Sequence, residues 1–533
     1  MSAYKILYIC PQTFYGEEVF LATFIRISNF LNAHLDEIPM EIEEEYVDLR
    51  FEDLPQYSSK NKKAFRESLS SFLSNLYENF PFDLVAIGCF TSYMYLNSVE
   101  IAYIIKSCLD VKKSIKIVVG GYHPSVCPMD FQVSEIPSYI KNNYNITSTP
   151  FDYLIREEAE LAFLNLVKQI FIDSDFKKKD DMKKPFILST QLIENLNEIP
   201  IIDYSLYKKY KANINKSEKV YLEFSRGCAF NCHFCPVSGN IVKSYKNVRY
   251  KSIEKCIEEL KVIRDTEWLK PKHVIIVDPT FLPKKEFRDS FLDALSKIEY
   301  PFHLAVNERI DTCEIEKFPL YNKLKIRLLI GLETGSPTLH KRFNKFPGSS
   351  TKKIRQYLEK TKQIIIASNK YDVPILFNYF SVVPGSTWQT YMESENFFFK
   401  PLNEKDGRSL SEKYKIDLIF ATYAGYRGSK LVKNCKKRFG AKIYYKEWWK
   451  KCSKNQAMMA SSIDPSSELS FPEALELAYN FGVRHFRNQR RLSNEWYSVV
   501  RFMALKTGKK KAIELYYSKN EKDRLEKNLL SII

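Results

Sequence analysis

The feature that most constrains this chain is an alternation of strand-like and helix-like segments that occurs twice along its length. In the first part, short runs rich in Val and Ile lie at Lys5–Cys10, Asp83–Cys89 and Ser114–Gly121, separated by segments with helical periodicity. Strands that alternate with helices form parallel sheets through right-handed crossovers. Residues 1–172 are therefore predicted to form an open, doubly wound α/β domain with a parallel sheet.

The same alternation starts again after a charged and polar stretch, residues 173–215, which we interpret as a linker. Six β/α units in sequence predict a partial (β/α)6 TIM-like barrel over residues 216–430, with catalytic groups at the carboxyl ends of its strands. Residues 431–533 are amphipathic and predict a mostly helical cap in which Trp448, Trp449 and Trp496 shape a substrate pocket. The six strand-like runs are Val220–Gly227, His273–Thr280, Phe302–Ile310, Lys325–Gly335, Ile375–Gly385 and Lys415–Gly425.

The composition favours an ordered protein with a basic surface. Hydrophobic residues make up 45% of the 533, and 81 Lys and Arg against 64 Asp and Glu give a net charge of +17. The lysines are scattered through amphipathic segments, which favours a solvated surface over a nucleic-acid site. With no secretory pattern and no apolar run of membrane-spanning length, we expect a soluble cytoplasmic protein without a membrane partner, whose 11 cysteines are reduced or bind metal. The oligomeric state is not indicated.

Three closely spaced cysteines follow the first strand of the second domain. Cys228, Cys232 and Cys235 lie in the segment Phe224-Ser-Arg-Gly-Cys-Ala-Phe-Asn-Cys-His-Phe-Cys-Pro236. Thiolates are the usual ligands of iron–sulfur clusters, and three of them leave one iron of a cubane cluster open to a substrate. Structural zinc, the alternative, needs four nitrogen or sulfur ligands, and no second C-x-x-C pair follows. We expect His233, between two of the cysteines, to be exposed or hydrogen-bonded.

The spacing Cys228-x-x-x-Cys232-x-x-Cys235, with Ser225-Arg226-Gly227 before it and Phe234 within it, resembles the signature of the radical S-adenosylmethionine (SAM) superfamily. The resemblance implies a [4Fe–4S] cluster held by these cysteines and SAM bound to the open iron. One electron, from an external donor such as flavodoxin or ferredoxin, then cleaves SAM to methionine and a 5′-deoxyadenosyl radical.

Segments at the ends of later barrel strands fit the same resemblance. Ile330-Gly-Leu-Glu333-Thr-Gly335 is similar to the family's G-x-E-(S/T)-G segment. The resemblance implies SAM contacts from Phe234, Asp278, Asn307, Arg309 and Glu333; it assigns no catalytic residue beyond the cluster ligands. Each position also has an ordinary structural interpretation: a helix cap for Asp278, a surface ion pair for Arg309 and a barrel lysine partner for Glu333.

The first domain resembles the Rossmann-like cobalamin-binding domain of the cobalamin-dependent radical SAM class. The chain has Glu157-Glu-Ala-Glu160 where the family often has G-E-G-E, and it lacks the D-x-H-x-x-G motif, so we do not assign His123 as a cobalt ligand. A purely structural domain is the alternative. The loops that carry the resemblance supply the candidate cobalamin contacts Pro11, Gly16, Ser92, Gly120, Gly121 and His123.

Together these resemblances imply a cobalamin-dependent methyltransferase that acts on an unactivated carbon or phosphorus centre of a small-molecule or peptide substrate. A non-methylating member that performs a cyclisation, ring contraction or oxidation is the alternative within enzymes. Outside enzymes, the alternative is an iron–sulfur regulatory or binding protein.

Overall fold

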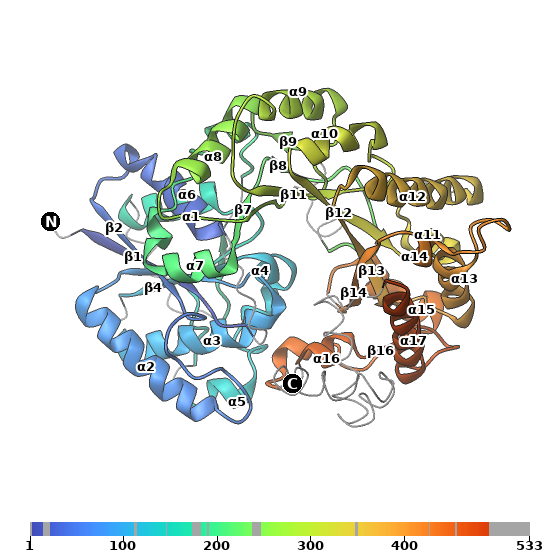
Figure 1. Ribbon diagram of the computed structural model, residues 1–533. Helices are drawn as coiled ribbons and strands as arrows, with labels where there is room; N and C mark the ends of the chain where they lie inside the picture. Colours follow the sequence, from blue (N-terminus) through green and yellow to red (C-terminus); the bar gives the residue numbers. More distant parts are fainter. Residues whose placement is uncertain are drawn as a thin grey trace, which may run out of the picture.

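The computed structural model describes residues 3–13, 22–110, 114–144, 147–172, 183–188, 191–236, 247–346, 350–425, 427–453 and 456–489. Two α/β halves lie side by side (Figure 1), the first built around the amino-terminal sheet and the second around the barrel sheet. Each sheet has six strands, and every strand pair within them is parallel. The predicted α/β class is confirmed for both halves.

The first sheet has the strand order β2-β1-β3-β4-β5-β6, which places the topological switch point between β1 and β3. Its central strands are apolar on both faces because helices cover both sides, as the all-buried β3 illustrates. The strands are β1 (Tyr4–Cys10), β2 (Ile42–Asp48), β3 (Leu84–Gly88), β4 (Lys116–Gly120), β5 (Tyr153–Ile155) and β6 (Phe186–Leu188); the helices are α1 (Thr23–Asn32), α2 (Lys62–Asn79), α3 (Tyr95–Ile104), α4 (Tyr122–Val126), α5 (Ser138–Lys141) and α6 (Glu160–Ile172).

The stretch expected to be a linker contributes structure to the first half. Within residues 173–215, β6 pairs with β5 as the edge strand of the first sheet, and α7 (Lys211–Ser217) leads into the barrel. Tyr210, just before α7, donates from its hydroxyl to Glu52 and accepts the backbone N–H of Asp48 at 2.8 Å. This stretch is therefore packed against the first domain at several points.

The second sheet has the order β14-β13-β12-β11-β10-β7 and is open between β7 and β14, so it is a partial barrel. All six expected strands are present. They are β7 (Lys219–Leu222), β10 (His273–Ile276), β11 (His303–Glu308), β12 (Ile326–Glu333), β13 (Ile375–Val382) and β14 (Asp417–Thr422); the helices between them are α8 (Ile253–Asp265), α9 (Lys285–Leu295), α10 (Phe318–Lys323), α11 (Pro337–Phe343), α12 (Thr351–Tyr371), α13 (Trp388–Phe399) and α14 (Leu410–Lys413).

The carboxyl-terminal region is helical where the structure describes it, with α15 (Lys430–Phe439), α16 (Gln456–Ser461) and α17 (Phe471–Gln489). A short antiparallel pair, β15 (Lys442–Ile443) and β16 (Ile463–Asp464), joins these helices. The expectation for Trp496 falls outside the described residues. No helix in the described ranges is long and apolar enough to cross a membrane.

Trp448 and Trp449 do not form the pocket wall that we expected. Both are buried, at 0% and 1% exposure, in a contact between the carboxyl-terminal region and the first domain. The indole N–H of Trp449 donates to Asp130 at 2.8 Å, and the ring of Trp448 lies 4.6 Å from that of Tyr93. Large aromatic groups gain most when they are fully covered, and here the first domain covers them.

Candidate active site

The carboxyl ends of the barrel strands surround a cavity of about 450 Å3. This volume lies in the range of small-ligand sites. The cysteine loop forms one wall, and groups from β11, β12 and β13 form the others. Of the residues proposed from the sequence, the cavity is lined by Cys228, Cys232, Phe234, Cys235, Asn307, Arg309 and Glu333.

The cysteine loop begins directly after the short strand β8 (Ser225–Arg226), which pairs with β9 (Arg249–Tyr250). Gly227 turns the chain into the loop with a φ of +95°, a conformation that favours glycine. Cys232 is buried, and Cys228 and Cys235 are half-buried. Burial raises the pKa of the Cys228 thiol, so a bound cation is needed to hold it as the thiolate at neutral pH.

The three thiols are not gathered closely enough for a single tetrahedral metal ion in this structure. Their sulfur atoms do not form one of the trios of potential ligand atoms that lie mutually within 4.8 Å in the described residues. A tetrahedral zinc ion with bonds of about 2.3 Å would bring its sulfur ligands to about 3.8 Å from one another. His233 is held elsewhere, since its Nδ1 lies 3.4 Å from Nη1 of Arg438. The donor set therefore fits a polynuclear cluster bound by three thiolates.

Two helices hold the cysteine loop from outside. The backbone N–H of His233 donates to the carbonyl of Phe343 at the end of α11, and its carbonyl accepts the N–H of Leu431 at the start of α15, both at 2.9 Å. The Tyr423 hydroxyl donates to the carbonyl of Phe234 at 2.9 Å. The Phe234 ring, from between Cys232 and Cys235, packs against those of Phe343 and Phe380, which fixes its position.

Arg309 brings a positive charge to the cysteines. Its guanidinium stacks on Phe230 at 3.6 Å, and Nη1 lies 3.6 Å from the sulfur of Cys232. Asp311 accepts two hydrogen bonds of 2.9 Å from the same guanidinium and fixes its plane. The arginine is 7% exposed, so the ion pair foreseen for it is present but is not a surface pair.

Glu333 is paired with a lysine that the sequence analysis did not identify. Lys345, from the segment between α11 and α12, lies with Nζ 3.3 Å from Glu333, and both side chains are buried. Burial alone would lower the pKa of Lys345, but Tyr357 and Glu333 raise that pKa above its ordinary value, so the ammonium stays charged. Glu333 has a φ of +67°, and such strain in a residue other than glycine is concentrated at functional sites.

Asp278 differs from the expectation. Its carboxylate does not line the cavity but accepts the Phe224 N–H at 2.8 Å and the Ser225 hydroxyl at 2.6 Å. Burial raises the pKa of Asp278 to about 7, although these hydrogen bonds favour the charged form. Its carbonyl accepts the Asn307 amide at 3.0 Å. Asp278 therefore supports the start of the cysteine loop.

A buried ionic network joins the first domain to the strand before the cysteine loop. Arg226 donates to Glu158 at 3.0 Å, to Glu223 at 2.8 Å and to Glu160. Glu158 also binds Arg249, so two arginines of the barrel meet two carboxylates of the first domain. The sequence did not reveal this network, because the pairs that join the two domains lie 66 to 91 residues apart.

The candidate cobalamin contacts lie at the carboxyl edge of the first sheet, with Gly16 outside the described residues. Pro11 is buried beyond β1, and Gly120 ends β4. Gly121 has a φ of +115°, and a Cβ there would come within 2.8 Å of the Cys89 carbonyl, so the turn itself requires glycine. The helix α4 that follows lies on the side of the first half that faces the barrel (Figure 1).

His123 and Ser92 form a buried pair at this edge. The Ser92 hydroxyl lies 2.8 Å from His123 Nδ1, and the ring of Trp449 covers the imidazole at 5.6 Å between ring centres. Burial lowers the pKa of His123, which favours a neutral ring. Nearby, both side-chain polar atoms of the buried Asn97 lack a hydrogen-bond partner within the described chain. An unpaired buried amide is costly and suits a ligand that supplies the missing partner.

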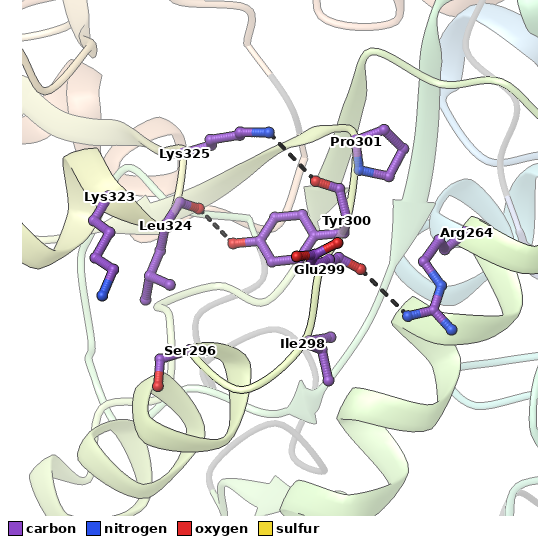
Figure 2. A pocket seen from close by; sticks show the side chains of 9 residues that line it. All are labelled: Arg264, Ser296, Ile298, Glu299, Tyr300, Pro301, Lys323, Leu324 and Lys325. Carbon is purple, nitrogen blue, oxygen red and sulfur yellow. Dashed lines mark hydrogen bonds between the residues drawn. The ribbon is translucent and has the colours of Figure 1, made fainter.

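A second cavity, of about 580 Å3, lies at the opposite, amino ends of the barrel strands (Figure 2). The Tyr300 hydroxyl donates to the Leu324 carbonyl at 2.5 Å, and Arg264 donates to the Glu299 carbonyl at 3.3 Å. These groups hold loops together at the end of a barrel that serves stability. The cavity at the carboxyl ends is therefore the candidate active site.

The fold and this cavity define a class: a partial-barrel enzyme with a three-thiol loop at the carboxyl edge of its sheet. Residues 222–397 match the family model of the radical SAM superfamily. These residues, about a third of the chain, run from the end of β7 into α13 and form a radical SAM domain.

Curated relatives are more distant. An uncharacterized methyltransferase of Pyrococcus horikoshii is 30% identical over 224 residues, which is 40% of this chain and 44% of the relative. The anaerobic magnesium-protoporphyrin IX monomethyl ester cyclase of Synechocystis is 23% identical over 270 residues, which is 46% of this chain and 52% of the cyclase. The chain thus spans about half the length of the curated relatives it matches.

Among solved structures, the cobalamin-dependent radical enzyme OxsB with bound aqua-cobalamin matches with a TM-score of 0.51 and 14% identity, over 81% of this chain and 55% of OxsB. The radical SAM methyltransferase TsrM from Kitasatospora setae, with tryptophan and a SAM analogue bound, matches with a TM-score of 0.52 and 13% identity, over 74% of this chain and 70% of TsrM. At these identities the likeness concerns the fold.

Proposed function

We propose that this protein is a cobalamin-dependent radical SAM methyltransferase. The observation that carries the radical SAM part is the single cavity on which the three cysteines and the polar groups of the barrel strand ends converge. When bound, the [4Fe–4S] cluster supplies the electron that cleaves SAM to methionine and a 5′-deoxyadenosyl radical.

The chain's own groups around the cavity suit a zwitterionic amino acid ligand. The ammonium of Lys345 offers a partner for the SAM carboxylate, and the carboxylate of Glu333 offers one for a positively charged or hydroxyl group. Arg309 places its charge against the sulfur of Cys232, which stabilises a thiolate and the net negative charge of a cluster. The edge of Phe234 and the side chain of Asn307 complete the walls.

The first test measures the cluster and SAM cleavage separately. Protein reconstituted without oxygen should hold about four irons per chain and release 5′-deoxyadenosine from SAM with dithionite. Cys228→Ser, Cys232→Ser and Cys235→Ser should each lose bound iron and SAM cleavage. Cys108→Ser, at an exposed cysteine, is the matched control and should keep both. Full iron and activity in the three cysteine variants would overturn the assignment.

Several features support cobalamin in the first domain. The sheet order has its switch point between β1 and β3, where ligands of open α/β sheets bind. The fold matches OxsB and TsrM, whose structures contain bound cobalamin. The unpaired amide of Asn97, in the first turn of α3, provides a polar group for a corrin side chain. Methylcobalamin would supply the methyl group, and the relative named a methyltransferase favours this use.

Cobalamin binding is tested by gel filtration with hydroxocobalamin and absorbance of the protein peak. We expect one corrin per chain, and Asn97→Ala should weaken binding about tenfold through loss of a hydrogen bond. Asn75→Ala, an exposed asparagine on α2, is the control and should bind as the wild type does. If the wild-type peak contains no corrin, the first domain has a purely structural role. If Asn97→Ala binds cobalamin as tightly as the wild type does, Asn97 is not part of the binding site.

The runner-up is a non-methylating reaction, favoured by the similarity to a cyclase. SAM labelled with deuterium in its methyl group separates the two. A mass gain of one trideuteromethyl group in the product supports methyl transfer, and a product without the label supports cyclisation, ring contraction or oxidation. We propose a small molecule or peptide as the substrate, presented between the barrel mouth and the first domain.

A further inference from the structure

The helix α15 forms the outer support of the cysteine loop and is strongly basic. Over its ten residues it carries five cations and no acidic residue. Its buried positions are Leu431 and Cys435, and Leu431 belongs to a small core against which Phe234 of the cysteine loop packs. A basic helix is therefore packed directly against the segment that carries the cluster ligands.

Two rows of side chains on α15 have different roles. Lys430 and Arg438 lie on one row, and both reach the cysteine loop: Lys430 donates to Asn231 at 3.4 Å, and Arg438 lies 3.4 Å from His233. Lys433, Lys436 and Lys437 are spaced by three and four residues on the row opposite the buried side. All three are exposed. One row thus anchors the loop while the other faces solvent.

Among the described residues, the exposed charges of α15 have no acidic partner. No ion pair in the described ranges joins Lys433, Lys436 or Lys437 to an acidic residue. Lys341 at the end of α11, the other helix that holds the loop, is also exposed. We call Lys341, Lys433, Lys436, Lys437 and Arg438 the basic face.

We propose that the basic face is the docking surface for a small acidic one-electron carrier protein that reduces the cluster. This inference rests on the proposed function, which requires an external electron. Charge complementarity argues for an acidic occupant, because unpaired surface lysines steer an oppositely charged protein to its site. The position of the basic face argues for an electron donor, because the helices that carry it contact the cysteine loop directly. If the lysines served only to keep the surface solvated, they would have no reason to cluster next to the cysteine loop.

The step is a simple electron transfer. A carrier with a fully reduced, anionic flavin loses one electron and keeps its proton, which leaves a neutral flavin radical. The electron would enter the cluster that Cys228, Cys232 and Cys235 would hold and would lower the charge of that cluster by one. No bond to the chain forms or breaks.

Binding is measured first, with purified oxidised flavodoxin as the probe and calorimetry at 50 and 200 mM salt. Wild-type affinity should fall steeply with salt, and the triple variant Lys433→Glu, Lys436→Glu, Lys437→Glu should bind at least tenfold more weakly. The neutral triple change to Gln should lie between the two. The matched control reverses Lys261, Lys270 and Lys323, exposed lysines near the amino ends of the barrel strands, and should bind within twofold of the wild type.

Turnover separates this inference from the proposed function. With dithionite, which needs no docking protein, the basic-face variant should make 5′-deoxyadenosine at the wild-type rate. With reduced flavodoxin it should be at least tenfold slower than the wild type at the same subsaturating concentration. Equal flavodoxin binding and turnover in variant and wild type would overturn the docking surface while the dithionite result leaves the function standing. No 5′-deoxyadenosine from the wild type with dithionite would overturn the proposed function.

A competing polyanion is tested in the same titration. A single-stranded 20-nucleotide DNA should bind the wild type no more tightly than flavodoxin does at 200 mM salt. Tighter DNA binding that the basic-face variant loses would assign the surface to nucleic acid instead and overturn the proposal.

Discussion

Arg226 holds three carboxylates at the junction of the two domains, and its removal gives a prediction with a calculable size. In Arg226→Met, Glu158 keeps its partner Arg249 and Glu223 keeps Arg26 at 2.9 Å. Glu160, at 6% exposure, is left without a cation. A buried charge deprived of its partner costs about 3–5 kcal/mol.

Protonation of Glu160 sets an upper limit on this cost. Burial alone would raise the pKa of Glu160, but in the wild type the charge and hydrogen bonds of Arg226 hold that pKa below its ordinary value of 4.5. In the variant, Glu160 can avoid being a buried unpaired charge by binding a proton. Protonation costs about 1.4 kcal/mol per pH unit above 4.5. The limit is about 4 kcal/mol at pH 7.5 and about 1.4 kcal/mol at pH 5.5.

The sign of the pH dependence follows from these pKa directions. The wild-type Glu160, with its lowered pKa, contributes stability that is present above pH 4.5 and lost only as the pH falls below it. In the variant the pKa of Glu160 is raised, so its contribution is present below 4.5 and lost as the pH rises. The deficit of the variant should therefore grow from pH 5.5 to pH 7.5.

Urea unfolding at pH 5.5 and 7.5, followed by tryptophan fluorescence, measures the deficit through the transition midpoints. The double variant Arg226→Met/Glu160→Gln should recover to within about 1 kcal/mol of the wild type, because no unpaired charge remains. Arg408→Met, which removes a surface ion pair, is the control and should leave both transition midpoints unchanged. A deficit below 1 kcal/mol at pH 7.5, equal deficits at both pH values, or no recovery in the double variant would refute the reasoning.

Three further outcomes are expected. Asp278→Asn should melt at a higher temperature than the wild type at pH 8 but not at pH 4. An aspartate whose pKa is raised to about 7 contributes stability that is lost as the pH rises through 7. Equal melting differences at both pH values would contradict this. Glu157→Gly should stabilise by about 1 kcal/mol in urea unfolding, because Glu157 has a φ of +64°, whereas Glu157→Ala should gain nothing. Trp449→Phe should cost about 1–3 kcal/mol by leaving Asp130 short of a donor, and should speed limited proteolysis between α15 and α17; unchanged cleavage would separate Trp449 from the domain contact.

Hydrophobic periodicity located all six barrel strands because each is at least four residues long and largely apolar, and five of them lead directly into a helical segment. In the first sheet it missed β2, β5 and β6 for identifiable reasons. β2 is an edge strand with a polar Glu43-Glu-Glu45 run: Glu43 is exposed, and the half-buried Glu44 accepts hydrogen bonds from Tyr8 and Ser28. β5 and β6 have three residues each, too few to show a period.

For the site, the sequence identified positions more reliably than side-chain directions. Asp278 sits at the end of β10 as expected, but along an extended segment successive side chains point to opposite sides, and its neighbours Val277 and Pro279 line the cavity instead. Lys345 lies 12 residues after Glu333, beyond α11, and no sequence motif links the two positions. Glu157 adopts the left-handed conformation, so the chain keeps a glycine-type turn at a position where the family often has glycine.

The proposed function requires the two halves to keep a fixed separation, and the contacts between the domains can provide it. A reaction that involves two cofactors and one substrate depends on holding the reacting atoms within a fraction of an ångström, and a misplacement of about 1 Å costs on the order of 100-fold in rate. In this chain, the ionic network around Arg226 fixes the first domain to the strand that enters the cysteine loop, and Trp449 fixes it again from the carboxyl-terminal side. Because these two contacts come from sequence regions more than 200 residues apart, the first domain is restrained at two separate points. Loosening either contact should then reduce coupling between SAM cleavage and product formation before it reduces SAM cleavage itself, since only the former requires both domains.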